Sequence, residues 1–315
     1  MNYFLLISQF LLTLVAAPFM IGMVRKAKAR FQNRRGASVF QPYWALLALM
    51  KKDMTITRYS SWVFRLVPFV VLAVAALLAL IIPTLAYGVI PDALSNVFLI
   101  GALAALGSAF LVLGGMDTAS TFGNMGSSRE MTLAALVEPA FFVTLATLGL
   151  LAHTWGLDGI VVFFASAPWV TVVPVASLTI GALFLVLLTE NARYPVDNPA
   201  THLELTMVHE AMILEYSGPY LAMLEYASAI KLTVMSILLM DLVLPFGLLH
   251  MPVTPLGIVI ALLAFFGKLL LAAFLVAFVE STVVKMRFYR MQEFLSMVAM
   301  LASAGLVLVL VALHS

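Results

Sequence analysis

The sequence predicts an all-α fold, a polytopic transmembrane bundle of about eight helices. Hydrophobic residues make up 63% of the 315 residues and charged residues only 10%, which leaves too few charges to coat a soluble surface. Apolar stretches of about 20 residues, the length that crosses a bilayer core, recur along the chain. They lack the period-two alternation that is typical of the strands of a membrane β-barrel.

The apolar stretches define eight expected spans. They lie at residues 3–24, 62–86, 94–114, 131–152, 170–189, 228–249, 256–280 and 291–313. The first has no basic residue before it and a basic cluster after it, the reverse of the flanks of a cleavable signal peptide, so we expect a retained helix. Residues 1–315 then form a single integral membrane domain with cytoplasmic loops at 25–61, 115–130, 190–227 and 281–290.

The basic residues predict the orientation of the bundle. Of the 17 Lys and Arg residues, all except Lys268 lie in or beside the odd-numbered loops. Because Lys and Arg concentrate in cytoplasmic loops, these loops are expected to face the cytoplasm and both termini to lie outside it.

Three ionisable residues fall inside the expected spans: Glu138, Asp241 and Lys268. Each would cost roughly 2.5–3.5 kcal/mol at the bilayer centre, so each should have a charged partner or line a water-filled cavity. Glu138 precedes Pro139, a residue that frees a backbone carbonyl and distorts helices. An Asp241–Lys268 pair that only holds two helices together is the alternative to a role in ion movement.

Residues 40–52 predict a shorter cytoplasmic helix. Aromatic and aliphatic residues are followed there by Lys51 and Lys52, a pattern typical of a helix that lies in the membrane interface. Composition alone does not distinguish such a surface anchor from a docking element for a partner.

A charged island extends from Glu190 to Lys231. It holds six of the chain's 15 carboxylates, namely Glu190, Asp197, Glu204, Glu210, Glu215 and Glu225. If these groups are partly buried, like charges and desolvation raise their pKa values into the range where carboxyl groups exchange protons. We therefore expect a proton-transfer path to begin here. A solvated acidic loop that binds a basic partner is the alternative.

Metal and redox sites are not expected in this chain. With no cysteine, it cannot ligate iron–sulfur clusters through thiolates, attach c-type haem or form disulfides. The pair His209-Glu210 lacks the second histidine of a zinc motif, whose place is taken by Ile213. His153 and His250 fall at span ends, unlike haem-ligating pairs. The glycine-rich residues 114–126 lack the spacing of a phosphate-binding loop.

At these residues the chain resembles a known family. This is the membrane subunit shared by respiratory complex I, where it corresponds to mitochondrial subunit 1 and its bacterial counterpart, and by energy-converting nickel–iron hydrogenases such as formate hydrogenlyase. Four blocks carry the resemblance: Arg35-Gly36 with Gln41-Pro42 and Lys51; Gly115-Met116-Asp117-Thr118 through Ser128-Arg129-Glu130 to Glu138-Pro139; Glu190 to Asp197 with Glu204-Leu205 and Glu215-Tyr216-Ser217; and Lys268 with Glu280 and Arg287-Phe288.

The resemblance leans towards the hydrogenase branch. Residues 115–133 look like the hydrogenase version of the third loop. In the fifth loop, Ala200 and His202 stand where complex I typically has acidic residues, and Val208–Met212 includes about three extra residues. Both departures argue against a complete quinone site.

The resemblance implies a subunit without redox centres that anchors a peripheral redox arm and couples its electron transfer to ion movement. By match to the family motif, the proton-relay or coupling carboxylates would be Glu138, Glu190, Asp197, Glu204 and Glu215. From their positions in the charged island and the spans, we add Glu225, Asp241 and Lys268 as candidates. Residues facing the peripheral arm or a quinone cavity would be Arg35, Gln41, Lys51, Asp117, Arg129, Glu130, Arg193 and Arg287.

The implied partners are nickel–iron hydrogenase-like large and small subunits, which would carry the nickel–iron and iron–sulfur centres, and antiporter-like membrane subunits. The expected location is the inner membrane of a prokaryote. The leading hypothesis is therefore a subunit of a proton-translocating hydrogenase complex. A quinone-site subunit of a complex I-type NADH dehydrogenase is the second hypothesis. A stand-alone secondary ion transporter is the third, although no internal repeat is visible between spans one to four and five to eight.

Overall fold

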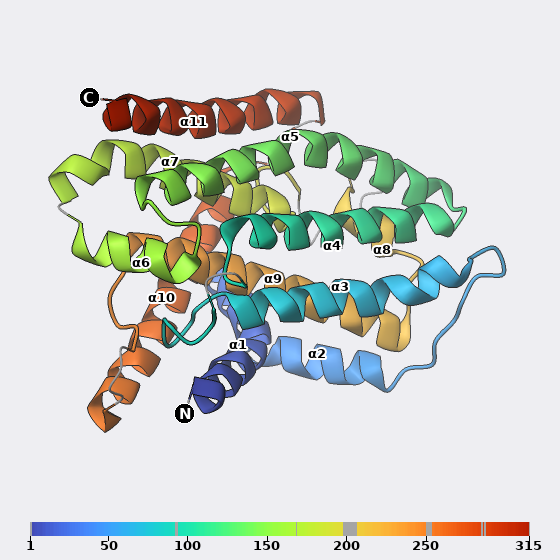
Figure 1. The fold of residues 1–315 in the computed structure, drawn as a ribbon. Coiled ribbons are helices and arrows are strands. Elements are labelled where there is room, and N and C mark those ends of the chain that lie inside the picture. The colour runs from blue at the N-terminus through green and yellow to red at the C-terminus, as the bar shows by residue number, and fades with distance from the viewer. Residues whose placement is uncertain are drawn as a thin grey trace.

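The computed structural model describes residues 2–91, 94–167, 169–197, 207–249, 254–284, 286 and 288–314. These residues form eleven helices (Figure 1). They are α1 (Asn2–Phe31), α2 (Gln41–Met50), α3 (Trp62–Ile81), α4 (Val97–Asp117), α5 (Thr121–Leu151), α6 (Leu157–Ser166), α7 (Trp169–Glu190), α8 (His209–Ile213), α9 (Gly218–Val243), α10 (Pro255–Thr282) and α11 (Phe288–His314).

Eight helices of the described chain are long and apolar enough to cross a membrane: α1, α3, α4, α5, α7, α9, α10 and α11. The expected all-α bundle of about eight spans is thereby confirmed. The short helix expected at residues 40–52 is also present as α2. The sequence patterns did not indicate α6 or α8, which are only ten and five residues long.

Several helices extend beyond the expected apolar stretches. α1 continues to Phe31, α5 begins at Thr121 and α9 begins at Gly218. Backbone hydrogen bonding continues where hydropathy falls, because polar side chains do not end a helix. Arg129, Glu130 and Glu225, which were expected in loops, therefore lie on helices.

α9 forms the centre of the bundle. It packs against α1, α2, α3, α7 and α10. Within its most apolar window 78% of the residues are buried, compared with 28% for α11, which covers α5 and α7 (Figure 1). Protein rather than lipid thus surrounds α9. This position permits ionisable residues on α9, since polar groups inside a membrane require protein or water around them.

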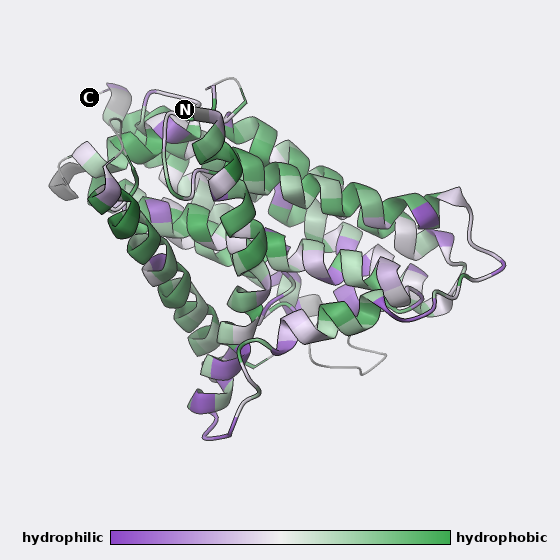
Figure 2. Ribbon diagram, turned by 90° about the horizontal axis from the view of Figure 1, so that it is seen from below, coloured by the Kyte–Doolittle hydropathy of each residue, from purple (hydrophilic) through white to green (hydrophobic). Residues whose placement is uncertain are grey.

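The charged residues gather towards one side of the bundle. In Figure 2 both termini lie at one corner, and the strongest hydrophilic colour lies at the far ends of the long helices. The turn between α4 and α5 lies on this far side and is only residues 118–120, because Ser120 Oγ accepts a hydrogen bond from the Gly123 N–H at 3.1 Å and caps α5. The candidate functional residues lie mostly on this side.

Candidate functional site

A cavity of about 430 Å³ lies among α1, α2, α8 and α9, and we call it the wide cavity. Pro42, the buried residue of α2, forms part of its wall. The charged residues that line it are Arg25 and Lys28 of α1, Arg193 after α7, Glu210 of α8, Glu225 of α9 and Glu280 of α10.

One carboxylate, Glu280, forms ion pairs with two of the cations that line this cavity. Glu280 accepts from Lys28 Nζ at 3.0 Å through one oxygen and from Arg193 Nη1 at 3.1 Å through the other. The Glu280 side chain is only 2% exposed. Lys28 Nζ also lies 4.6 Å from the centre of the Tyr194 ring, a cation–π contact. The cluster therefore joins α1, the turn after α7 and α10 through buried charge-assisted hydrogen bonds.

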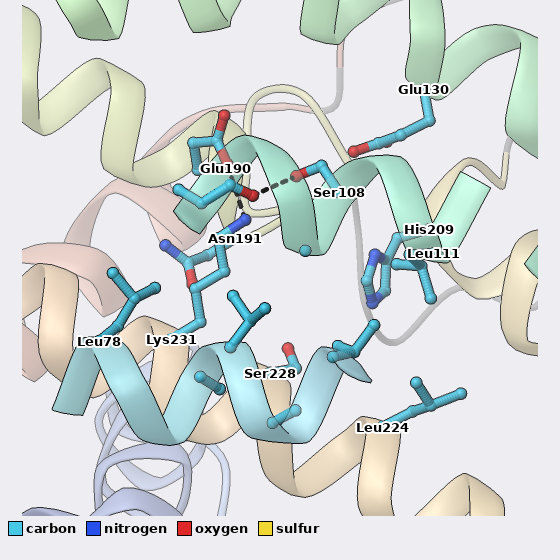
Figure 3. Close-up of a pocket in the computed structure, with 16 residues that line it drawn as sticks. Leu78, Ser108, Leu111, Glu130, Glu190, Asn191, His209, Leu224, Ser228 and Lys231 are labelled. Atoms are coloured by element: carbon cyan, nitrogen blue, oxygen red, sulfur yellow. Dashed lines mark hydrogen bonds and ion pairs between the residues drawn. The ribbon is translucent and has the colours of Figure 1, made fainter. Parts of the chain in front are cut away.

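A second, smaller cavity of about 50 Å³ lies between α3, α4, α5, α7 and α9, and we call it the narrow cavity. Lys231 Nζ of α9 lies 2.7 Å from Glu190 Oε2 of α7 at one end of it. Figure 3 shows Glu130 and His209 on the other side, approaching from α5 and α8. Its remaining walls are mostly aliphatic, so its charged groups lie in apolar surroundings.

Four residues line both cavities: Asn191, His209, Leu224 and Ser228. They form the wall between the wide and the narrow cavity, and we call them the partition. His209 is its titratable member. Asn191 donates to the Leu187 carbonyl at 2.8 Å, whereas its buried Oδ1 has no hydrogen-bond partner among the described residues.

Two predicted site residues fix the segment that carries His209. One carboxylate oxygen of Asp197 accepts from the backbone N–H of Val208 at 3.3 Å and of His209 at 3.1 Å. Arg129 Nη1 donates to the Met207 carbonyl at 3.1 Å. Asp197 and Arg129 thus hold the start of α8 against the bundle.

The glycines of α4 and α5 permit this close packing. A Cβ on Gly126 would lie 2.9 Å from the Ala211 Cβ, and one on Gly115 would lie 2.5 Å from Ser127 Oγ. Any larger residue at these two positions would push α8 or α5 outward, so the two glycines allow α8 to pack closely against α4 and α5.

Burial sets the protonation of the two titratable residues at the start of α8. The pKa of Glu210 is raised to about 7, chiefly by desolvation and then by the carboxylates of Glu225 and Asp197, while Arg25 opposes these effects. Desolvation lowers the pKa of His209 to about 4, against the opposing effect of Asp197. Near neutral pH Glu210 therefore exchanges its proton readily, and His209 is a neutral imidazole that can both donate and accept one.

The predicted relay residues do not all lie at these cavities. Glu130 and Glu190 line the narrow cavity and Glu225 the wide one. Glu138 lies farther along α5 and is half-buried, close enough to Glu190 and Lys231 for their charges to act on it. Glu204 lies outside the described residues.

Asp241 and Lys268 form a separate buried pair. Lys268 Nζ lies 2.8 Å from Asp241 Oδ1, with side chains 5% and 1% exposed, and neither residue lines the wide or the narrow cavity. The second carboxylate oxygen of Asp241 has no hydrogen-bond partner among the described residues. Each ion therefore has the charged partner expected for it, and the pair joins α9 to α10.

Of the residues expected to face a peripheral arm, some are exposed and others make contacts within the bundle. Arg35, Gln41 and Lys51 are exposed, around and within α2. Asp117 instead caps α3, since its carboxylate accepts from the backbone N–H of Ser61 at 2.8 Å and of Phe64 at 3.1 Å. Arg193 is buried against Glu280. Arg287 lies outside the described residues.

Glu215 is half-buried beside Tyr216 and lines neither cavity. The Tyr216 ring stacks on Phe64 at 4.0 Å, and its hydroxyl donates to the Phe64 carbonyl at 3.2 Å. Burial raises the pKa of Tyr216 well above its usual value. This segment holds α3 to the start of α9.

Six charged or titratable residues at the cavities are absent from the predicted site: Arg25, Lys28, His209, Glu210, Lys231 and Glu280. His209 and Glu210 belong to the charged island, but their spacing was tested only against a zinc motif. Arg25 and Lys28 contributed only to the charge bias, and Lys231 only marked the end of the charged island. Glu280 occurs in one of the sequence blocks that carry the family resemblance, and that block was the signal that could have identified it. In the described part of the chain no group of three or more His, Asp or Glu residues is arranged to hold a metal ion.

Comparison with known proteins gives the family. The family model described as NADH dehydrogenase matches residues 3–312. Hydrogenase-4 component C of Escherichia coli (strain K12) is 32% identical over 294 residues, which cover 90% of this chain and 88% of that protein. Formate hydrogenlyase subunit 4 of the same organism is 28% identical over 279 residues, 89% of each chain.

More distant similarities agree with this assignment. An NADH-quinone oxidoreductase subunit from Anaplasma phagocytophilum (strain HZ) is 27% identical over 251 residues, 72% of each chain. A solved chain of the membrane-bound sulfane sulfur reductase, an archaeal respiratory membrane complex, superposes with a TM-score of 0.81 over 98% of this chain and 99% of that chain. At 16% identity this last likeness shows a shared fold. The chain therefore belongs to the NADH dehydrogenase family, and the longer matches to hydrogenase subunits favour its hydrogenase branch.

Proposed function

We propose that this chain is the membrane-anchoring and ion-coupling subunit of a multi-subunit energy-converting hydrogenase complex. It would link electron transfer in a peripheral arm to proton translocation. The observation that supports this best is the arrangement of two charged cavities that share one wall. Together they lead from the side of the bundle where the basic loops gather to acids on α5 and α7.

The exposed residues around α2 support the anchoring half of the proposal. Arg35, Gln41 and Lys51 are free to contact a peripheral subunit. Phe40, Trp44, Leu47 and Met50 are also more than half exposed. A hydrogenase-like arm that docks here would place its iron–sulfur and nickel–iron centres on the cytoplasmic side, next to the wide cavity. Antiporter-like membrane subunits would continue the ion path.

The titration of Glu210 supports the coupling half. Its pKa of about 7 means that a modest change of local potential changes its protonation, because one pKa unit corresponds to about 1.4 kcal/mol. An electron that arrives in the arm would raise the affinity of Glu210 for a proton. Protons would then move through the acids of the narrow cavity towards Glu138.

The test uses the whole complex in sealed vesicles. Glu138→Gln and Glu190→Gln variants are expected to keep hydrogen evolution while proton translocation per hydrogen molecule falls at least tenfold, a loss typical of a missing proton-transfer group. An exposed carboxylate variant, Glu293→Gln, is the control. Normal translocation by both variants in a fully assembled complex would overturn the coupling role.

A quinone-site subunit of an NADH dehydrogenase is the second candidate. The volume of the wide cavity, about 430 Å³, favours it, because small-molecule sites usually occupy about 300–1,000 Å³. Identification of the partner subunits that copurify distinguishes the two. A nickel–iron large subunit supports the hydrogenase complex, and a flavin-containing NADH-oxidising subunit supports the quinone-linked one.

A further inference from the structure

We propose that His209 is the residue through which protons cross the partition between the wide and the narrow cavity. This inference rests on the proposed coupling function and adds a specific carrier to it. The position of His209 is the first argument. Of the four residues that line both cavities, Leu224 is aliphatic, and Asn191 and Ser228 do not titrate in the physiological range.

The groups on the two sides of His209 are the second argument. The wide cavity presents Glu210 and Glu225, and the narrow cavity presents Glu130 and Glu190. No described carboxylate lines both cavities. A proton that passes between these two sets of acids therefore needs a carrier at the partition, and an imidazole has two ring nitrogens that can face different sides.

The local charges keep the ring in the form that this role requires. The cations Lys231 and Arg193 act against protonation of His209 and Asp197 favours it, while burial lowers its pKa to about 4. At pH 7 about one molecule in a thousand would carry an imidazolium there. A neutral ring does not trap the proton, so it can release one as it receives another.

The transfer step conserves atoms and charge. One ring nitrogen accepts a proton from the wide cavity, and the N–H bond of the other nitrogen breaks to release a proton into the narrow cavity. The imidazole is neutral before and after, with its tautomer exchanged, and rotation of the ring restores the starting state.

The backbone geometry permits a substitution that tests the side chain alone. Asp197 holds the backbone N–H of His209 at 3.1 Å, so this contact does not depend on the side chain. His209→Gln keeps a polar amide of similar length that cannot carry protons, and His209→Ala opens space at the partition. His153, which is exposed in the turn after α5, provides the matched control His153→Gln.

The experiment measures hydrogen evolution and proton translocation by the whole complex in vesicles. We expect His209→Gln and His209→Ala to lose roughly tenfold or more of the translocation per hydrogen molecule, consistent with removal of a proton-transfer group. Added imidazole should restore translocation in His209→Ala, and His153→Gln should match the wild type. A merely structural role would not produce rescue by imidazole.

Two results would overturn the inference. One is normal translocation by both His209 variants, and the other is a loss in His209→Ala that imidazole does not restore. A Glu190→Gln variant measured in parallel separates this failure from failure of the proposed function. If Glu190→Gln stops translocation while the His209 variants keep it, coupling stands and the carrier is a different group. If all three variants and Glu138→Gln translocate normally, the coupling function fails as well.

Discussion

Lys231 Nζ lies 2.7 Å from Glu190 Oε2 and joins α9 to the end of α7 beside the narrow cavity. The carboxylate side chain is 6% exposed and the lysine side chain 20% exposed. Removal of one partner from such a pair leaves the other charge without compensation in an apolar wall, which costs more than the intact pair contributes.

Glu190→Gln should therefore lower the free energy of unfolding by about 3 kcal/mol, at the lower end of the range for a broken buried pair because Lys231 retains some solvent. The Glu190→Gln/Lys231→Met double variant should recover much of this loss. Thermal unfolding of the purified chain in detergent measures both. Equal stability of the single and double variants would show that the two charges do not depend on each other.

Disruption of the Asp241–Lys268 pair should lower stability more than disruption of the Glu190–Lys231 pair. Both side chains are almost completely buried, so Lys268→Met alone should destabilise by about 3–5 kcal/mol and Asp241→Leu/Lys268→Met should restore most of it. The same unfolding assay applies. If the double variant assembles into the complex but does not translocate protons, the pair also belongs to the ion path, the alternative to a pair that only holds two helices together.

The pKa of Glu210 predicts a pH-dependent stability. Its folded value is about 7, above the ordinary value of 4.5, so the folded state binds the proton more tightly. The contribution of Glu210 is fully present below pH 4.5 and is lost as pH rises through 7. Glu210→Gln resembles the protonated acid and should remove this loss, which is at most about 3 kcal/mol for a shift of this size.

Thermal unfolding of both proteins between pH 5 and 8 measures this difference. The melting temperature of wild type should fall relative to Glu210→Gln as pH rises. Glu215→Gln, at a carboxylate that lines neither cavity, is the control and should parallel the wild type. Parallel curves for Glu210→Gln and wild type would contradict the assigned burial of Glu210.

The spans were predictable because each depends on a local property. Apolar stretches such as residues 62–86 and 256–280 reach the length of the bilayer, and the charges between them are few. The helix ends were not predictable in this way. A hydropathy window stops at charges such as Glu130, whereas helix α5 begins where its N-cap forms, at Ser120. The difference moved Glu130 from a loop to a helix face at the narrow cavity.

The partners within the site could not be predicted from the sequence, because they are distant along the chain. Glu280 is 87 residues from Arg193 and 252 residues from Lys28, and only the packing of α10 on α1 brings them together. His209 shows the same limit. The residues that follow it in the sequence form only an incomplete zinc motif. Its place between the two cavities depends on the packing of α5, α7 and α9 together.

Asp117 illustrates how a family motif can hold a structural residue. Its carboxylate caps α3 through two backbone N–H groups. Asp117→Ala should lower stability by about 1–2 kcal/mol, whereas Asp117→Asn keeps a capping oxygen and should lower it by less than about 0.5 kcal/mol. Unfolding of the chain in detergent tests this. Equal loss in both variants would mean that the negative charge matters more than the cap.

Glu280 should be the most sensitive carboxylate at the wide cavity. It is the counter-ion of both Lys28 and Arg193, so Glu280→Gln leaves two cations close together with no opposing charge between them. We expect a loss of at least about 3 kcal/mol in the free energy of unfolding, since two buried charges lose their partner. Adding Lys28→Met should restore part of it, because one cation is then removed. Glu293→Gln, at an exposed carboxylate on α11, should change stability by less than about 0.5 kcal/mol. If Glu280→Gln were as stable as Glu293→Gln, the two contacts to Glu280 would contribute nothing, and α1, α10 and the turn after α7 would be held together by apolar packing alone.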